Sequence, residues 1–465
     1  MPDTGAHRST PHAQHRLAWL DELIFKIFQQ TGRSQLMQII WVYDREVDLA
    51  ELTHSHAAIA NQPFINRLIE PSPLPWGRSR WVRPTTDSIQ IKQNPQILPR
   101  SRMLSWANQE LKPPIDPVAG PPWRLAIQRF DDGTSAVSLV LSHLIIDGSF
   151  KAFYFAATDG FQGNSSPYLP KARRGRLIGC LQDTWQCIVE TPRTVTALAK
   201  IFNANWQMFA TLLQGLTAGA SKTIPTIQLP VELPSVAVII DAPAWDDCER
   251  RLGGSGAVNS LLVGIVATLA SHLGRTRPSD GAVSLVIPIS KRNGPSDGRA
   301  QAIEPQMMTV VPAFLSTNLQ PLNSQLRDVL RNSRESNIDR FTSLLPAIAW
   351  LPKTISLALM NQFFDYTENL PVSCSNQGFL PDEFGRIDGA QCSYIMNRGA
   401  DINVTRSDLE RTRGHLVVVA CRYNNTVTLC IEACQLESTP TTTDDLRSMT
   451  LRTMADFGLD AVIEA

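Results

Sequence analysis

Several residue patterns that mark common classes of enzyme are missing from this sequence. It has no Cys-x-x-Cys pair and no Cys/His cluster with the spacing of zinc ligands, so no metal site is predicted. It also has no Gly-x-Ser-x-Gly turn, no Walker-type phosphate loop and no Gly-x-Gly-x-x-Gly loop. These absences argue against a serine hydrolase of the α/β type and against the common nucleotide-binding folds. We therefore expect neither a metal nor a bound cofactor.

The sequence also has no excess of charge of either sign and no long apolar run. Lysine and arginine total 43, and aspartate and glutamate also total 43, so the net charge is zero. A nucleic-acid-binding protein would carry a basic excess. A membrane-spanning helix would need about 18 or more consecutive apolar residues. We therefore expect a protein that neither binds nucleic acid nor spans a membrane.

The cysteines and the N-terminal residues predict a cytoplasmic protein. The 8 cysteines are scattered, which in a chain of 465 residues is typical of reduced core residues. The polar start, from Met1 to Arg8, lacks the apolar stretch of a secretion signal. The apolar fraction of 43% is that of a globular chain, and the length is sufficient for two or three domains.

Strands and helices alternate on both sides of a proline-rich linker at residues 221–235. Before the linker, the patterns predict helices at 20–28, 48–61 (capped by Asp48), 148–157, 176–189 and 195–216, and strands at 36–43, 123–130 and 135–141. After it, they predict strands at 236–240, 283–287, 308–315, 415–421 and 427–434, and helices at 244–251, 257–272, 326–340, 347–362 and 444–457. The similar order predicts an α/β protein of two related lobes, each a mixed sheet flanked by helices.

The predicted boundaries divide the chain into four parts. These are a disordered leader at 1–15, an N-terminal lobe at 16–175, a helical connector with the linker at 176–235, and a C-terminal lobe at 236–465. Within the connector, Trp206, Met208 and Phe209 have the spacing of a core or lid segment. Contact of this face with lipid is the alternative.

One histidine is notable because an apolar run leads directly into it. Residues 135–141 form the second strand of a hairpin about the Asp-Gly turn at 131–133, and this strand ends just before His143. A neutral imidazole can take a proton from a hydroxyl near pH 7, so His143 is a candidate general base. The alternative is a core histidine bonded to a backbone carbonyl. Asp147 and Gly148, which follow across a turn, favour the catalytic interpretation.

Asp147 could either orient the His143 ring or brace the loop that carries it. A buried carboxylate needs a cationic partner. Arg292 is a candidate, because it follows a strand that is predicted to stop at Pro288 and then presents Ser290 and Arg292 as the wall of a cleft. The alternative is that these residues form a solvated basic turn.

Six segments, spread from the first predicted helix to the C-terminal half, resemble the motifs of one superfamily. They are Leu20-Asp21-Glu22-Leu-Ile-Phe25, Pro121-Pro122-Trp123-Arg124-Leu125, Ser142-His143-Leu-Ile-Ile-Asp147-Gly148, Val258-Asn259-Ser260, Pro288-Ile-Ser290-Lys-Arg292 and Val372-Ser373-Cys-Ser375-Asn376. In this order they resemble the CoA-dependent acyltransferase superfamily, which includes chloramphenicol acetyltransferase and the condensation domains of peptide synthetases. The most similar branch is that of the bacterial wax ester synthases/diacylglycerol acyltransferases. The resemblance covers nearly the whole chain.

The resemblance implies both the fold and the reaction. Two chloramphenicol-acetyltransferase-like lobes would meet at an active-site tunnel, which acyl-CoA would enter from one face and the acceptor from the other. His143 would act as general base on the hydroxyl of a hydrophobic alcohol or diacylglycerol, and no covalent acyl-enzyme would form. Acyl-CoA would be a co-substrate rather than a bound cofactor. Peripheral contact with a membrane or lipid droplet belongs to the same expectation.

The resemblance also implies roles for single residues. Asp147 would pair with Arg292 and hold the loop, while Gly148 would complete the catalytic motif and Ser142 would support it. The residues expected on the substrate side are Ser290, Asn376, Asn259 and Trp123.

Two departures from the branch pattern leave alternatives open. Ser142 stands where the first histidine of a His-His-x-x-x-Asp-Gly motif is expected, and Ser260 replaces the aspartate of an Asn-Asp pair. The first alternative is a condensation-domain-like transfer in secondary metabolism, with a carrier-protein thioester as donor. The second is a non-catalytic scaffold of the same fold, against which the intact residues around His143 argue.

Overall fold

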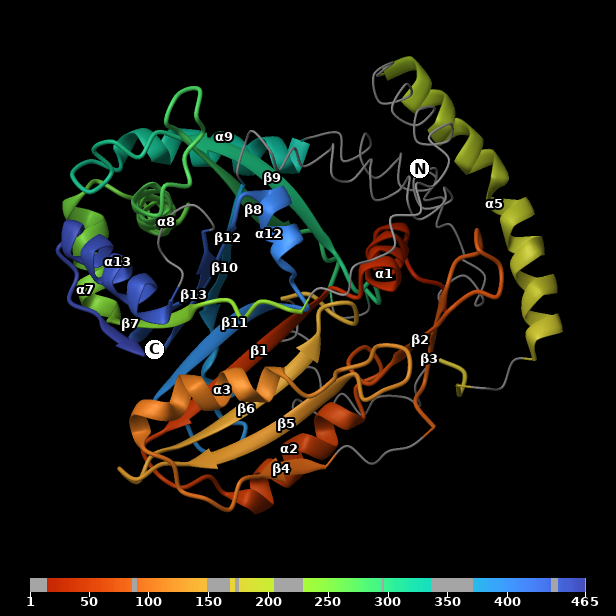
Figure 1. Ribbon diagram of the computed structural model, residues 1–465, viewed down its shortest axis with the longest axis horizontal. Helices are drawn as coiled ribbons and strands as arrows, with labels where there is room; N and C mark the ends of the chain where they lie inside the picture. The colour runs from red at the N-terminus through yellow and green to blue at the C-terminus, as the bar shows by residue number, and fades with distance from the viewer. Residues whose placement is uncertain are drawn as a thin grey trace, which may run out of the picture.

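The structure is a computed structural model, and it describes residues 15–85, 90–148, 168–171, 175–204, 229–294, 297–335, 371–435 and 442–464. Several predicted segments lie essentially outside these residues: the 1–15 leader, the helices at 148–157 and 347–362, the Trp206 segment and most of the linker. Within the described residues, the helices and strands form two lobes, each built around one large sheet (Figure 1). The two-lobed α/β prediction is therefore confirmed.

The first lobe contains a five-stranded sheet with the order β11-β1-β6-β5-β4. Its strands are β1 (Ser34–Tyr43), β4 (Ile91–Gln93), β5 (Trp123–Arg129), β6 (Ser135–Ser142) and β11 (Tyr394–Ile402). Successive side chains of a strand point to opposite faces. In β1, Trp41 packs in the cluster that includes α2 (Leu49–Ala60), and Ile40 packs in the cluster that includes α3 (Met103–Leu111). A helix on each face thus covers the apolar residues of this sheet.

Two local predictions in this lobe are confirmed. β5 and β6 form the expected antiparallel hairpin, with Trp123 opposite Leu141. Asp48 caps α2, because its Oδ1 accepts hydrogen bonds from the N–H groups of Ala50 (2.8 Å) and Glu51 (3.2 Å).

The second lobe contains a seven-stranded sheet with the order β14-β7-β13-β12-β10-β8-β9. Its strands are β7 (Ser235–Asp241), β8 (Val283–Ser290), β9 (Ile303–Val310), β10 (Val372–Leu380), β12 (His415–Tyr423), β13 (Thr426–Cys434) and β14 (Val462–Glu464). Helices α7 (Ala242–Arg251), α8 (Ser260–His272), α9 (Gln320–Glu335) and α13 (Thr443–Asp456) pack beside it (Figure 1). α8 is buried, with no exposed side chain from Ser260 to Ala270.

Strand β11 joins the two halves of the chain. It belongs to the C-terminal half of the sequence but pairs antiparallel with β1 of the first lobe. Its buried Arg398 donates to Oε1 of Gln38 in β1 (3.1 Å) and to Oγ of Ser235 at the start of β7 (3.0 Å). The sequence analysis predicted no strand at these residues, so its boundary at residue 236 does not anticipate this crossing.

Two strand boundaries in the second lobe differ from the predictions. β8 continues through Pro288 to Ser290 instead of stopping at the proline. β10 pairs with β8 only at Leu285 and Val286, so the later part of β8 has fewer ladder bonds for a proline to interrupt. β9 spans Ile303–Val310 instead of 308–315, because Pro305 within it disguises the strand pattern. α9 also begins earlier than predicted.

α5 (Arg176–Ala204) is one helix where two were predicted. Pro192 lies inside it, at the position where the sequence suggested a break. A proline removes one helical hydrogen bond and crowds the preceding turn, which a helix can tolerate when its other residues favour it. The prediction of a break there was therefore wrong.

The remaining elements connect these layers. They are α1 (Trp19–Thr31), β2 (Leu68–Glu70), β3 (Arg80–Val82), η2 (Arg100–Arg102), η3 (Asp382–Gly385) and α12 (Arg406–Thr412). Among the helices of the described residues, none has the length and apolar character needed to cross a membrane.

Candidate active site

His143 directly follows β6, as the sequence predicts. Its backbone N–H donates to the carbonyl of Gln35 in β1 (2.9 Å). The chain then turns. The N–H of Ile145 donates to the carbonyl of Ser142 (3.0 Å), and the N–H of Leu144 donates to Oγ of Ser142 (3.3 Å). Ser142 is fully buried, and it shapes the turn that presents His143.

The ion pair that the resemblance implies is present. Nη2 of Arg292 lies 2.9 Å from Oδ2 of Asp147, and both side chains are almost completely buried. The same carboxylate oxygen accepts a hydrogen bond from the N–H of Ala302 (2.8 Å). Arg292 also donates to the carbonyls of Asp297 (2.6 Å) and Arg299 (3.0 Å). These bonds compensate for the removal of both charges from water.

Residues 297–302, which we call the 297–302 segment, are tied to the first lobe at several points. The buried carboxylate of Asp21 in α1 accepts hydrogen bonds from the N–H groups of Ala300 (3.0 Å) and Gln301 (2.8 Å). Burial raises the pKa of Asp21 to about 6, although these two bonds oppose the rise. Arg67 donates both to the carbonyl of Gly298 (2.6 Å) and to that of Ile145 in the His143 turn (2.7 Å).

Gln301 of this segment contacts His143 directly. Its side-chain amide nitrogen lies 3.0 Å from Nδ1 of the ring and also donates to the backbone carbonyl of His143. The ring itself is hydrogen-bonded to that same carbonyl. The bond to its own carbonyl needs a proton on Nδ1, whereas the Gln301 amide nitrogen, which can only donate, needs a lone pair there, so the two contacts favour opposite tautomers of the neutral ring. Nε2 has no hydrogen-bond partner among the described residues.

The surroundings of His143 keep its ring neutral near pH 7. Burial lowers the pKa of His143 below its usual 6.5, because a protein interior solvates the imidazolium poorly. The carboxylate of Asp147 and the bond from the ring to its own carbonyl oppose this effect without reversing it. A neutral, oriented imidazole is the form that a general base requires.

Gly148 lies where the second lobe approaches the motif. A Cβ atom at this position would be 2.5 Å from Nε2 and 2.7 Å from Oε1 of Gln377 in β10. A side chain at this position would therefore displace the amide end of Gln377. Gln377 was not among the predicted site residues.

Ser290 and Asn376 lie at the margins of this region. Ser290 is the last residue of β8, is exposed, and precedes Arg292 by two positions. Asn376 is exposed beside a bulge in β10, and its Oδ1 accepts a hydrogen bond from the N–H of Gly378 (2.8 Å). Both positions are close in sequence to residues that touch the His143 loop. Their substrate-binding roles stay predictions.

The structure does not bring the other two expected substrate residues to the site. Trp123 has no exposed surface and packs in the first-lobe core, with its ring 5.0 Å from that of His56. Asn259 is exposed in the second lobe, where its left-handed backbone begins α8. Trp123 is therefore a core residue, because its large apolar ring faces inward from a covered strand. Asn259 shapes a helix start.

Gln301, Asp21 and Arg67 are the residues that the sequence analysis missed. Asp21 belonged to a motif quoted for the resemblance, but its partners lie 279 and 280 positions away along the chain. Gln301 follows Arg292 in a polar stretch without a regular pattern. The available signal was the presence of charged residues within otherwise apolar segments, such as Asp21 in the first helix.

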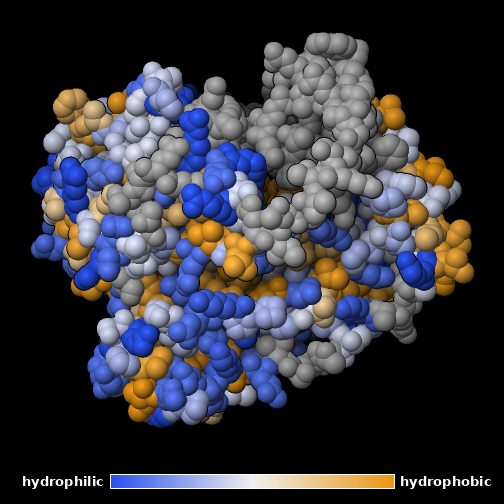
Figure 2. Space-filling view, in the orientation of Figure 1, coloured by the Kyte–Doolittle hydropathy of each residue, from blue (hydrophilic) through white to orange (hydrophobic). Residues whose placement is uncertain are grey.

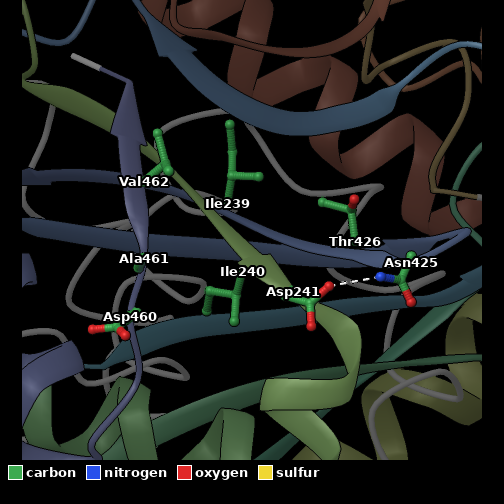
Figure 3. A pocket seen from close by; sticks show the side chains of 8 residues that line it. All are labelled: Ile239, Ile240, Asp241, Asn425, Thr426, Asp460, Ala461 and Val462. Carbon is green, nitrogen blue, oxygen red and sulfur yellow. Dashed lines mark hydrogen bonds between the residues drawn. The ribbon is translucent and has the colours of Figure 1, made fainter.

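A separate surface pocket lies at the opposite edge of the seven-stranded sheet (Figure 3). It is formed by the ends of β7 and β13 and by β14, whereas Arg292 and Gln301 are next to β8 and β9 at the other edge. Nδ2 of Asn425 donates to Oδ1 of Asp241 across it (2.6 Å). The residues that line it include no histidine or cysteine, so we assign it no chemistry.

Comparisons with known proteins identify the fold. No family model matches the sequence, and no curated protein matches it either. Among solved structures, the first condensation domain of the CDA synthetase is 11% identical, with a TM-score of 0.52, over 96% of this chain and 99% of that one. The chain has the condensation-domain fold.

Two further condensation-domain structures are similar over nearly their full length. The first condensation domain of the calcium-dependent antibiotic synthetase, in complex with a substrate analogue, is 13% identical with a TM-score of 0.52, over 95% of both chains. A starter condensation domain of rhizomide synthetase, in complex with C8-CoA and Leu-SNAC, is 14% identical with a TM-score of 0.51, over 97% of this chain and 95% of that one. These identities establish the fold alone.

Proposed function

We propose that this protein is an acyltransferase that moves an acyl group from a thioester to a hydroxyl, with His143 as general base. The observation that carries the proposal is the His143 ring, which burial keeps neutral, whose Nδ1 lies 3.0 Å from the Gln301 amide nitrogen and whose Nε2 has no hydrogen-bond partner among the described residues. The proposal requires the neutral tautomer with its proton on Nδ1, which the bond to the ring's own carbonyl favours. The buried pair of Asp147 and Arg292 keeps the loop in one conformation. The condensation-domain fold supports the same chemistry.

The proposed reaction balances without a covalent intermediate on the protein. Nε2 of His143 takes the hydroxyl proton as the acceptor oxygen attacks the thioester carbonyl carbon. A C–O bond forms, the C–S bond breaks, and the proton passes from Nε2 to the leaving sulfur. The products are an ester and a free thiol.

We favour acyl-CoA as the donor and a hydrophobic alcohol or diacylglycerol as the acceptor. The structure of a rhizomide synthetase starter domain with C8-CoA supports the donor, because that domain shares this fold. The acceptor follows from the resemblance to wax ester synthases/diacylglycerol acyltransferases. A carrier-protein thioester is the second candidate donor, because the similar structures are domains of peptide synthetases. A scaffold without activity is the remaining alternative.

The test is thiol release from acyl-CoAs of graded chain length, with and without a long-chain alcohol or diacylglycerol. We expect acceptor-dependent release that falls by about 10²- to 10⁴-fold in His143→Ala, which is the usual contribution of a general base. His54→Ala is the matched control, because His54 is exposed on α2, and this variant should keep full activity.

Three results would decide among the alternatives. Release that requires an acylated carrier protein, and still depends on His143, would favour the condensation-type reaction. Equal turnover by wild type and His143→Ala would reject the mechanism. No release from any donor, with a folded protein, would favour the scaffold.

A further inference from the structure

Helix α5 carries apolar side chains on the outside of the molecule. Between residues 177 and 189, six of them are more than half exposed: Leu177 (82%), Ile178 (56%), Leu181 (74%), Trp185 (67%), Ile188 (58%) and Val189 (53%). Their spacing places them on one face of the helix. The helix runs along one edge of the molecule in Figure 1, and hydrophobic residues gather along that edge in Figure 2. We call these six residues the α5 stripe.

The acidic side chains of the same helix face the protein instead. Asp183 is fully buried, and its carboxylate contacts Arg16 (3.0 Å) and the hydroxyl of Ser72 (2.6 Å). Glu190 is also buried and pairs with Arg78 (2.5 Å). An ordinary surface helix turns its apolar face inward and its charges outward. In α5 the apolar face points outward, and the buried ion pairs of Asp183 and Glu190 keep the helix in this orientation.

The distribution of charge around the α5 stripe limits what can bind there. From Leu177 to Pro192 the only charged residues are Asp183 and Glu190, and both face inward. The outer face therefore offers a charged protein partner nothing to pair with. Arg176, which is exposed, lies directly before this stretch in the same helix. An apolar strip with a cationic end is complementary to an anionic lipid surface.

The size of the α5 stripe argues against a second copy of the chain as its partner. The stretch from Leu177 to Val189 makes a strip about 20 Å long and 10 Å wide on one helix. A stable dimer buries roughly 800 Å² on each partner. A single helix face that meets its own copy supplies much less than that area. The acyl chains of a lipid surface, in contrast, rearrange around each side chain and can cover the whole strip.

We propose that the α5 stripe docks this protein on a membrane or lipid surface that contains anionic headgroups. The helix lies in the plane of the interface, with its apolar side chains among the acyl chains and Trp185 at the headgroup boundary. This inference concerns where the protein binds and does not depend on the proposed acyl transfer.

Sedimentation of the full chain with vesicles tests the proposal. The vesicles are phosphatidylcholine alone, or phosphatidylcholine mixed with phosphatidylglycerol. We expect wild type to bind the anionic vesicles, and the variant Leu181→Gln/Trp185→Gln/Ile188→Gln to lose about tenfold or more of its partition coefficient. The matched control is Ile97→Gln/Leu229→Gln/Val311→Gln, which replaces three residues that are also exposed (59%, 83% and 61%) on other parts of the surface.

The control variant should bind vesicles like wild type. The proposal fails if wild type stays in the supernatant with both vesicle compositions, or if the stripe variant binds as tightly as wild type. It also fails if wild type is a dimer that the stripe variant converts to a monomer without any vesicle binding. Circular dichroism establishes that each variant is folded, so that lost binding reports the surface alone.

Discussion

His143 is a residue whose position depends on groups from distant parts of the chain. Gln35 holds its backbone N–H, and Gln301 holds its carbonyl and the Nδ1 edge of its ring. Asp147 pairs with Arg292 and thereby holds the loop that follows His143. Each partner thus holds a different part of the His143 loop.

The buried pair of Asp147 and Arg292 predicts a large asymmetry between single and double substitutions. Asp147→Ala leaves Arg292 buried without its carboxylate and should lower the free energy of unfolding by about 3–5 kcal/mol. Asp147→Leu/Arg292→Met should cost less than this single change, because no charge is left unpaired. Urea denaturation measures both. The matched control is Asp247→Asn in the exposed pair with Arg250, which should change stability by only about 0.5 kcal/mol or less. A double variant less stable than Asp147→Ala would contradict this reasoning.

Gln301 predicts a change in the pH dependence of the reaction. In wild type, the acidic limb of kcat/KM should lie below pH 6.5, because burial lowers the pKa of His143. Gln301→Glu puts a carboxylate beside Nδ1, which favours the imidazolium, so the limb should move to higher pH. Gln301→Ala should lower kcat more than it changes KM, because only the orientation of the ring is lost.

Gln109→Glu adds the same charge on an exposed surface and serves as the control. Its pH profile should match that of wild type. An unshifted limb in a folded Gln301→Glu protein would show that Gln301 does not position the base.

At the scale of elements, β11 is held to the second sheet by a cluster of charged side chains. His415 in β12 contacts Glu432 in β13 (3.1 Å) and Asp401 in β11 (3.7 Å). Burial disfavours the imidazolium, but the two carboxylates together raise the pKa of His415 above its usual 6.5. The charged ring therefore bridges strands of both lobes.

This cluster predicts a stability difference with a definite sign. Because the folded protein binds the His415 proton more tightly than the unfolded chain, its contribution is complete below about pH 6.5 and is lost as the pH rises through the folded pKa. A pKa that is higher by one in the folded protein than in the unfolded chain corresponds to about 1.4 kcal/mol of stability. His415→Gln should thus destabilise the protein more at pH 6 than at pH 8.5, as measured by urea denaturation at both values.

His272 provides a control of opposite sign. Burial lowers the pKa of His272, with Asp456 opposing, so this group costs stability as the pH falls below about 6.5. The stability of His272→Gln relative to wild type should therefore improve at the lower pH. The same pH trend in both variants would contradict the assignment of these two pKa directions.

At the scale of the whole molecule, the two lobes share a strand and should not fold apart. A fragment of residues 1–228 lacks β11, so the outer edge of β1 would be unpaired and open to aggregation. We expect this fragment alone to aggregate, and co-expression with residues 229–465 to yield a soluble complex with the circular dichroism of the intact chain. A stable, monomeric fragment 1–228 would contradict this view of the fold.

The parts of the site that could be predicted are those encoded within a few consecutive residues. The β5–β6 hairpin, His143 at its end and Asp147 across the turn follow from local alternation and turn chemistry. Arg292 was found through the resemblance, because its strand lies in the other lobe. Gln301 and Gln377 could not be found, since no local pattern distinguishes them from other polar residues.

By itself, the sequence determined many of the strands and helices, the two-lobed α/β class and the residues of the His143 motif, because periodicity and turn residues act over short distances. Only the tertiary structure decided that β11 crosses to the first sheet, that Trp123 is core, and that Asp21, Arg67 and Gln301 converge on the His143 turn. It alone decided that α5 turns its apolar face outward, since its ion pairs join residues more than a hundred positions apart. Such contacts depend on how the chain folds back on itself, which no local pattern records.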